Sequence, residues 1–132
     1  MDIPITNYKI KIDYPDRFVE IIIGKDQAQR YSDRYLPNDP ELLDGFINGH
    51  ELDGLTISCG MQYLLCLPKE FNHLTVYHEV FHVCMRIWYD AGANLSFPEN
   101  DEVITYMIGT VVKRIEEIYE WESKQNLQNK QA

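Results

Sequence analysis

The stretch His78-Glu79-Val80-Phe81-His82 places two histidines four residues apart, with a glutamate directly after the first. On a helix, such histidines lie one turn apart on the same side, where their imidazole nitrogens can converge on one tetrahedral zinc ion. Glu79 follows about 100° around the helix, from where it can reach a metal-bound water without becoming a ligand. The pattern therefore predicts a zinc site at His78 and His82 with Glu79 beside it.

Catalytic zinc commonly takes three protein ligands and leaves one position for water, so a third ligand must come from elsewhere. His50 is a poor candidate because Gly54 stands where a second histidine would be needed, and His73 lies roughly 140° from the first motif histidine around the helix. The acidic residues within 99–102 are a better source. They follow a turn at Gly92 and open the next helix, so antiparallel packing would return them to the zinc face.

The helix after this acidic group offers further side chains. Glu102 and Tyr106 are one turn apart on a common side, and Gly109, two turns after Glu102, is predicted to let the two helices approach closely. Acidic residues are also expected at a helix N-terminus because the helix dipole favours them. Glu99 and Asp101 are therefore alternative ligands to Glu102.

The elements that position these residues follow from hydrophobic periodicity and turn residues. Strands are expected at 8–14, 18–23, 55–59 and 61–67, the last two as a hairpin. Helices are expected at 25–36, after Asp39-Pro40, at about 71–90, and from an N-cap at Ser96, Asn100 or Asp101 to about residue 121. The helix at 25–36 is expected at the surface, with Ala28, Tyr31 and Tyr35 at helical spacing and the tyrosines as core or surface packing. The inward positions expected in the other helices are Leu42, Leu43, Phe46 and Ile47; Leu74, Tyr77, Phe81, Cys84 and Trp88; and Ile104, Ile108, Val111, Ile115 and Ile118. This order predicts an α+β fold, a small antiparallel or mixed sheet on two long C-terminal helices. We expect one domain over 1–122 and a polar, flexible tail over 123–132.

Composition narrows the function classes. A formal charge of −9 disfavours nucleic acid and anionic membranes as partners. The chain has no apolar run near the roughly 18 residues that span a bilayer, and its first residues lack the pattern of a secretion signal. Three cysteines without a pairing pattern predict free thiols, with Cys84 as a small buried apolar residue. These features predict a cytoplasmic globular protein.

The motif at 78–82, followed by D-E-V-I-T at 101–105, resembles the gluzincin arrangement of thermolysin-type metallopeptidases. The resemblance covers roughly residues 55–122 and implies a zincin-like fold. It implies zinc as cofactor, with His78, His82 and Glu102 as ligands and Glu79 as general base. Nineteen residues separate His82 from Glu102, a spacing that suits this arrangement. The chain also resembles short H-E-x-x-H proteins encoded by phages and prophages.

Two departures from the family pattern bear on function. Tyr106 stands where the family has an aspartate that orients the first histidine. We also expect no separate C-terminal domain to supply the His and Tyr that assist the larger enzymes. Arg86, one turn beyond His82, and Tyr106 are the nearest candidate donors to a developing oxyanion, with His73 as a more remote third. Arg86 has the alternative role of a salt-bridge partner for the acidic group, and Tyr106 that of a packing residue.

The resulting hypothesis is a zinc-dependent hydrolase that cleaves peptide bonds in a peptide or protein substrate. The exposed edge of the strand at 61–67 is predicted to pair with that substrate. Two alternatives remain open: a non-catalytic binding or assembly protein whose zinc is structural or vestigial, and a metal-free helical hairpin. The substrate and the oligomeric state are not predicted.

Overall fold

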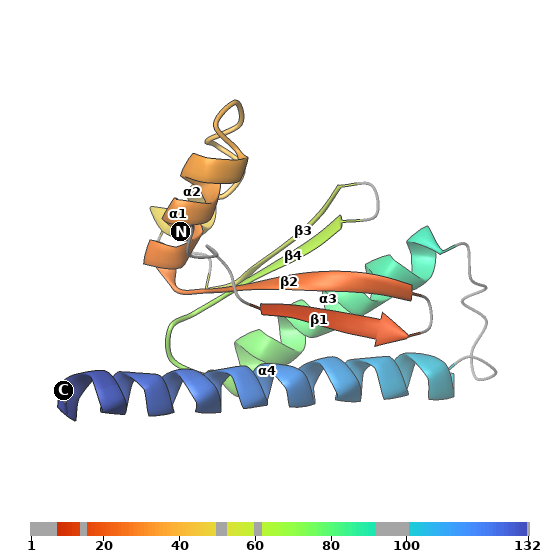
Figure 1. The fold of residues 1–132 in the computed structure, drawn as a ribbon. Coiled ribbons are helices and arrows are strands. Elements are labelled where there is room, and N and C mark those ends of the chain that lie inside the picture. Colours follow the sequence, from red (N-terminus) through yellow and green to blue (C-terminus); the bar gives the residue numbers. More distant parts are fainter. Residues whose placement is uncertain (1–7, 14–15, 50–52, 60–61, 92–100, 132) are drawn as a thin grey trace.

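The computed structural model describes residues 8–13, 16–49, 53–59, 62–91 and 101–131 (Figure 1). In chain order the elements are β1 (Tyr8–Asp13), β2 (Asp16–Ile23), α1 (Lys25–Tyr35), α2 (Asp44–Ile47), β3 (Leu55–Cys59), β4 (Gln62–Leu67), α3 (His73–Asp90) and α4 (Asp101–Gln131). The strands lie in the N-terminal half and the two long helices in the C-terminal half. The predicted α+β class is confirmed.

The four strands form one mixed sheet in the order β1-β2-β4-β3. β1 and β2 are antiparallel, β3 and β4 are antiparallel, and β2 pairs with β4 in parallel at the centre. The predicted hairpin of the third and fourth strands is confirmed. The prediction of a free edge at 61–67 was wrong, because β4 is paired on both sides; the edge strands are β1 and β3.

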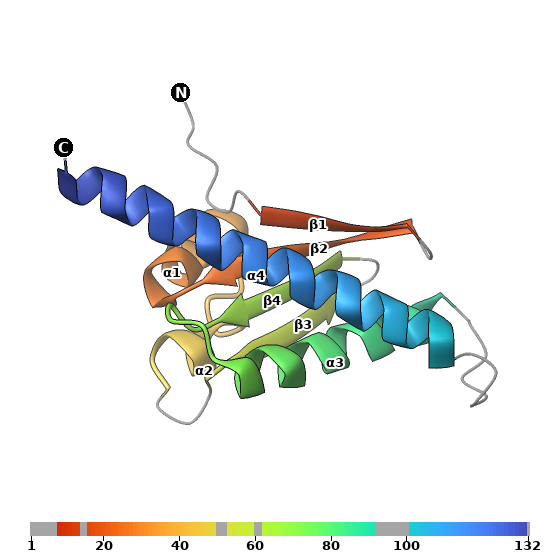
Figure 2. The same ribbon diagram turned by 90° about the horizontal axis from the view of Figure 1, so that it is seen from below.

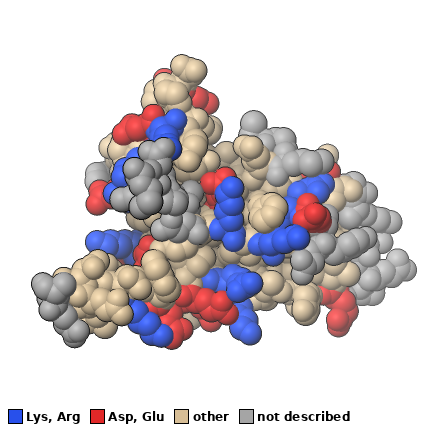
Figure 3. Space-filling view, in the orientation of Figure 1, with Lys and Arg blue, Asp and Glu red and all other residues tan. Residues whose placement is uncertain are grey.

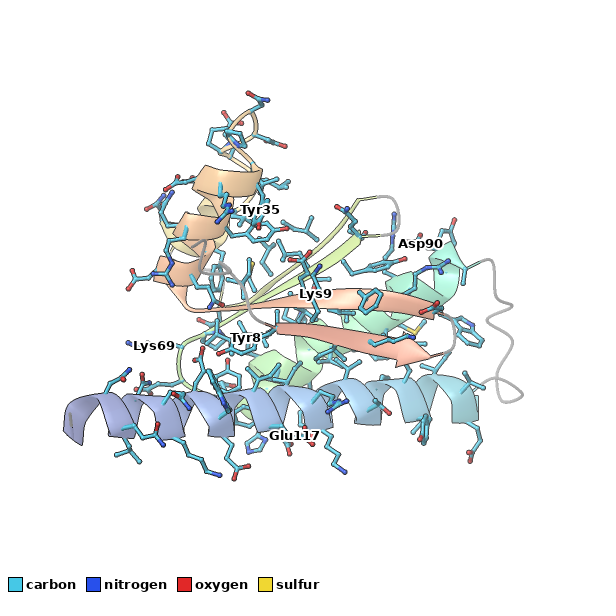
Figure 4. The ribbon with its side chains drawn as sticks, viewed as in Figure 1. Tyr8, Lys9, Tyr35, Lys69, Asp90 and Glu117 are labelled. Atoms are coloured by element: carbon cyan, nitrogen blue, oxygen red, sulfur yellow. The ribbon has the colours of Figure 1, made fainter. Side chains whose placement is uncertain are left out.

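The alternation predicted for the first strand is confirmed. Tyr8, Ile10 and Ile12 are buried, whereas Lys9 and Lys11 are exposed, because successive strand residues point to opposite faces. Figure 4 shows Tyr8 and Lys9 on opposite sides of the sheet. Tyr14, which was expected to continue this face, lies outside the described residues.

Helices cover both faces of the sheet. Figures 1 and 2 show α3 and α4 side by side on one face, with α1 and α2 on the other. The core beneath α3 and α4 includes Val19, Ile21, Leu65, Val80, Ile87, Val111 and Ile115. The smaller core beneath α1 and α2 includes Ile22, Ala28, Leu43, Phe46, Leu64 and Cys66. The central strands therefore contribute alternate residues to two cores.

The two small helices follow the prediction in position and only partly in orientation. Ala28 is buried as expected, but Ser32 is buried and Tyr35 is 53% exposed. In the second helical segment Phe46 is buried, whereas Leu42 lies at the surface. Of the residues at helical spacing in α1, Ala28 therefore faces the core and Tyr35 lies at the surface.

The inward face predicted for α3 was mostly wrong. Leu74, Tyr77 and Phe81 are exposed by 84%, 48% and 53%, and only Cys84 and Trp88 of the predicted stripe are buried. The buried residues are Val76, Glu79, Val80, Val83, Cys84, Ile87 and Trp88. The helix therefore packs its β-branched stripe on the sheet. Relative to the prediction, the helix is rotated about its axis, so that Glu79 faces inward and both motif histidines face outward.

Helix α4 keeps the predicted inward positions but not the predicted end. Ile104, Val111 and Ile115 are buried, and Ile108 and Ile118 pack partly against the same core. The helix continues beyond residue 121 to Gln131, through the segment expected as a tail. It does so because that segment is rich in helix-forming Lys and Gln and contains no Gly or Pro.

Candidate metal centre

His78 and His82 lie together on the outward face of α3. Their Nε2 atoms are 3.1 Å apart, and their rings meet edge to face with centroids 4.6 Å apart. Both side chains are exposed, that of His78 by 66%. The four-residue helical spacing thus brings the two nitrogens together, as predicted from the motif.

The separation of the two Nε2 atoms is close to what a shared metal requires. Two Zn–N bonds of about 2.0–2.1 Å at a tetrahedral angle hold their nitrogens roughly 3.3 Å apart. The same separation also suits a hydrogen bond between neutral imidazoles, in which one ring donates and the other accepts. The pair is therefore pre-arranged either to share a metal ion or to bond to itself.

Glu79 lies between the histidine pair and the sheet. It is only 8% exposed, and its Oε1 is 4.0 Å from Nε2 of His78. Its Oε2 accepts a hydrogen bond from Oγ1 of Thr56 in β3. One carboxylate oxygen is therefore held by the sheet, and the other lies on the side of the histidines.

Glu102 and Tyr106 share a different part of the surface. Both line a hollow of about 390 Å³ between α4 and β1, together with Lys11, Ile12, Val103, Met107 and Thr110. Tyr106 is 79% exposed. Among the described residues, α3 contributes no side chain to this hollow. The predicted roles of Glu102 as ligand and Tyr106 as donor therefore stay predictions.

Gly109 does not mediate the approach of the two long helices. It is exposed, and a Cβ atom built at this position meets no heavy atom of the described part of the chain within 4 Å. The prediction of a close helix–helix contact at Gly109 was wrong. The close contact of α3 is with Gly54, at the start of β3.

Arg86 is engaged within its own helix. Its Nε lies 3.3 Å from Oδ1 of Asp90, and its guanidinium lies over the ring of Tyr89. Asp90, at the end of α3 in Figure 4, also accepts a hydrogen bond of 2.9 Å from the hydroxyl of Tyr63. Burial raises the pKa of Tyr63, and this hydrogen bond adds to the effect. The role of Arg86 as an oxyanion donor stays a prediction.

Within the described ranges, no three His, Cys, Asp or Glu side chains form a group that could hold a metal ion. Glu99 and the side chain of Asp101, the alternative ligands, lie outside the described residues. Burial raises the pKa of the Cys66 and Cys84 thiols to about 12, and the charge of Glu79 adds to the effect at Cys66. These thiols stay protonated at neutral pH and are poor metal ligands. The buried position predicted for Cys84 is confirmed.

Two residues of this region were not singled out from the sequence. Thr56 holds the carboxylate of Glu79, and Gly54 lies against the stem of the same side chain. The only available signal was strand alternation, which places Thr56 on the face opposite Leu55 and Ile57. A polar residue on that face is equally consistent with exposure to solvent, so the alternation did not predict the contact with Glu79.

Comparisons of this chain with protein-family models, with curated proteins and with solved structures found no match. The residues of this chain and their geometry are therefore the basis of its proposed function.

Proposed function

We propose that this chain is a zinc-dependent hydrolase, a minimal metallopeptidase of the gluzincin kind. His78 and His82 bind the metal, and Glu79 is the general base. The observation that carries the proposal is the 3.1 Å separation of the two Nε2 atoms, with Oε1 of Glu79 4.0 Å from the first of them. The third ligand comes from the acidic group at 99–102, with Glu102 implied by the resemblance.

The donor atoms support zinc as the metal. Unprotonated imidazole nitrogens are ligands that zinc prefers, and the exposed position of both rings leaves space for a further ligand and a substrate. When bound, zinc supplies a Lewis acid that activates water and polarises a carbonyl group. Oε1 of Glu79 accepts the proton released in the attack, and Glu79 then passes it to the leaving amine.

The substrate in this proposal is an extended peptide segment. Among the described strands β3 lies at an edge of the sheet, and none of them pairs with its outer side, where a peptide can add to the sheet. Thr56 of this strand bonds to Glu79, so a segment bound there runs close to the proposed base. Nucleic acid is disfavoured by the formal charge of −9, and Figure 3 shows acidic and basic side chains interspersed along α4.

The test is turnover of a fluorescently labelled unfolded protein by the zinc-loaded chain. Glu79→Gln should keep its zinc and lose at least about a hundredfold in kcat, because general-base catalysis commonly contributes that much. Glu117→Gln is the matched control, since Glu117 is exposed on α4 and paired with Arg114. Equal cleavage by Glu79→Gln and the parent, or full cleavage in excess chelator, would contradict the proposal.

The second candidate is a non-catalytic binding or assembly protein with structural zinc. It is favoured by the burial of Glu79 and its bond to Thr56, which together tie α3 to β3. The same assay separates the two: this candidate predicts bound zinc without turnover, and Glu79→Gln then changes stability alone.

We further propose a cytoplasmic location. Among the described residues, no helix is both long enough and apolar enough to cross a membrane. Cys66 and Cys84 are free thiols in the core, as is usual in reducing compartments.

A further inference from the structure

Thr56 faces α3 because of its register in the sheet. It lies opposite Leu65 of β4, while its neighbours Leu55 and Ile57 pack on the other face against the core beneath α1 and α2. Its Oγ1 is 3.3 Å from the backbone oxygen of Glu79 and closer to Oε2 of the same residue. A hydroxyl has one proton, so the shorter contact is the hydrogen bond that Thr56 donates.

Gly54 brings the strand and the helix close at the same place. A Cβ atom on residue 54 would lie 2.8 Å from Cγ of Glu79 and 2.9 Å from Cγ2 of Thr75. Both distances are shorter than real Cβ contacts, so a side chain at residue 54 would displace Glu79 or the helix. The stem of Glu79 is therefore confined by the strand, and the remaining freedom is rotation of its carboxylate.

We propose that Thr56 is a positioning residue for Glu79. Its hydrogen bond to Oε2 fixes the rotation of the carboxylate so that Oε1 lies on the side of His78, 4.0 Å from Nε2. This inference rests on the proposed function, because it assigns Thr56 a role through Glu79 as general base.

Glu79 needs such a partner because the last side-chain torsion of glutamate, which sets the orientation of the carboxylate, is weakly restricted. Rotation about this bond has broad minima, so a carboxylate without a fixed partner samples several orientations. A general base must present its oxygen to the proton within hydrogen-bond geometry, and misplacement by about 1 Å costs up to a hundredfold in rate. Removal of the Thr56 hydroxyl should therefore lower kcat more than it changes KM.

The experiment compares Thr56→Val, which keeps the shape of the side chain, with Thr56→Ser, which keeps the hydroxyl. Tyr8→Phe is the matched control, because it removes a hydroxyl that also joins a strand to a glutamate of a helix, Glu122, outside the proposed site. In the zinc-loaded chain we expect Thr56→Val to lower kcat by roughly tenfold or more. KM and zinc content should stay near the parent values, and the other two variants should keep the parent kcat. Thr56→Ala replaces Thr56→Val if the latter does not fold.

A second readout needs no metal and no turnover. Crystal structures of the zinc-free parent and variants should show Oε1 of Glu79 near His78 in the parent and in Thr56→Ser, and rotated away in Thr56→Val. The positioning role is overturned if Thr56→Val melts at a lower temperature yet keeps the parent kcat and the parent carboxylate orientation. If the parent itself does not cleave, the proposed function falls and the positioning role falls with it. Cleavage by the parent with an unaffected Thr56→Val removes the positioning role alone.

Discussion

Glu79 and Glu102 were both predicted as parts of one zinc site, and their surroundings are opposite. Glu79 is 8% exposed, bonded to Thr56 and 4.0 Å from a motif histidine. Glu102 is exposed at the start of α4 and lines a hollow against β1. The two glutamates differ because their positions depend on contacts of different sequence separation. Glu79 is placed by neighbours in its own helix and by one strand, whereas Glu102 depends on how two helices meet.

The same contrast appears at the two glycines. Gly54 lies where β3 and α3 approach too closely for a side chain, whereas Gly109 faces open space on α4. The tight contact of α3 is thus with the sheet edge beside Glu79. The histidine–glutamate motif therefore lies at the close junction of α3 and β3, whereas the proposed third ligand lies outside this junction.

The largest expected effect is on metal binding by the histidine pair. His82→Ala should reduce bound zinc from about one per chain to nearly none, because it removes one of two converging imidazoles. His73→Ala is the control, since His73 lies at the first turn of α3, stacked on Tyr77, and is not expected to bind. Metal analysis after dialysis measures both. Zinc retained in full by His82→Ala would refute the two-histidine site.

A smaller loss of affinity is expected at the third ligand. Glu102→Ala should lower zinc affinity about tenfold or more, since a carboxylate ligand contributes to the charge and geometry of the site. Glu117→Ala on the same helix should leave affinity unchanged. Competition with a chelator of known affinity gives the constants. Parent-like affinity in Glu102→Ala would remove this ligand and transfer the assignment to Glu99 or Asp101, whose alanine variants then decide.

The glycine contrast predicts opposite changes in stability. Gly54→Ala should lower the free energy of unfolding by about 1–3 kcal/mol, because its methyl group meets Glu79 and Thr75 at less than 3.0 Å. Gly109→Ala should raise it by up to about 1 kcal/mol, because alanine is the better helix former and has free space. Denaturant unfolding of the two variants checks the signs. Equal shifts would show that the junction of β3 and α3 is not tightly packed.

The smallest effect concerns the far half of α4. Tyr8 donates a hydrogen bond of 2.7 Å to Glu122, which joins β1 to this helix away from Glu102. Tyr8→Phe should lower the free energy of unfolding by about 1 kcal/mol. Burial raises the pKa of Tyr8, and Glu122 adds to the effect. Its contribution is therefore full below the unfolded pKa near 10 and declines as pH rises above it. A Tyr8→Phe chain that loses stability above pH 10 as steeply as the parent would contradict this.

Local patterns in the sequence predicted where the helices and strands lie. They predicted which face is buried correctly for β1 but mostly wrongly for α3. The alternation of 8–12 identified the buried face of β1 because one face of that strand is charged. Helix α3 carries two overlapping apolar stripes, and periodicity alone did not rank them. The large side chains Leu74 and Phe81 suggested one face, but Val76 and Val80 fill the core.

Non-local pairing explains most of the remaining differences. A hairpin at 55–67 does not reveal that β2 inserts beside β4 and makes it a central strand. The bond from Thr56 to Glu79 joins residues 23 positions apart and depends on that sheet order. The histidine pair needed only the spacing of one helix, so it was predictable from the motif.

The proposed function requires that His78 and His82 bind one zinc ion through their Nε2 atoms. A crystal structure of the chain with one equivalent of zinc, measured at the zinc absorption edge, checks this claim. The claim predicts an anomalous peak about 2.0–2.1 Å from both Nε2 atoms. A zinc-treated crystal in which the two nitrogens bond to each other and the anomalous signal is absent or lies elsewhere would contradict it.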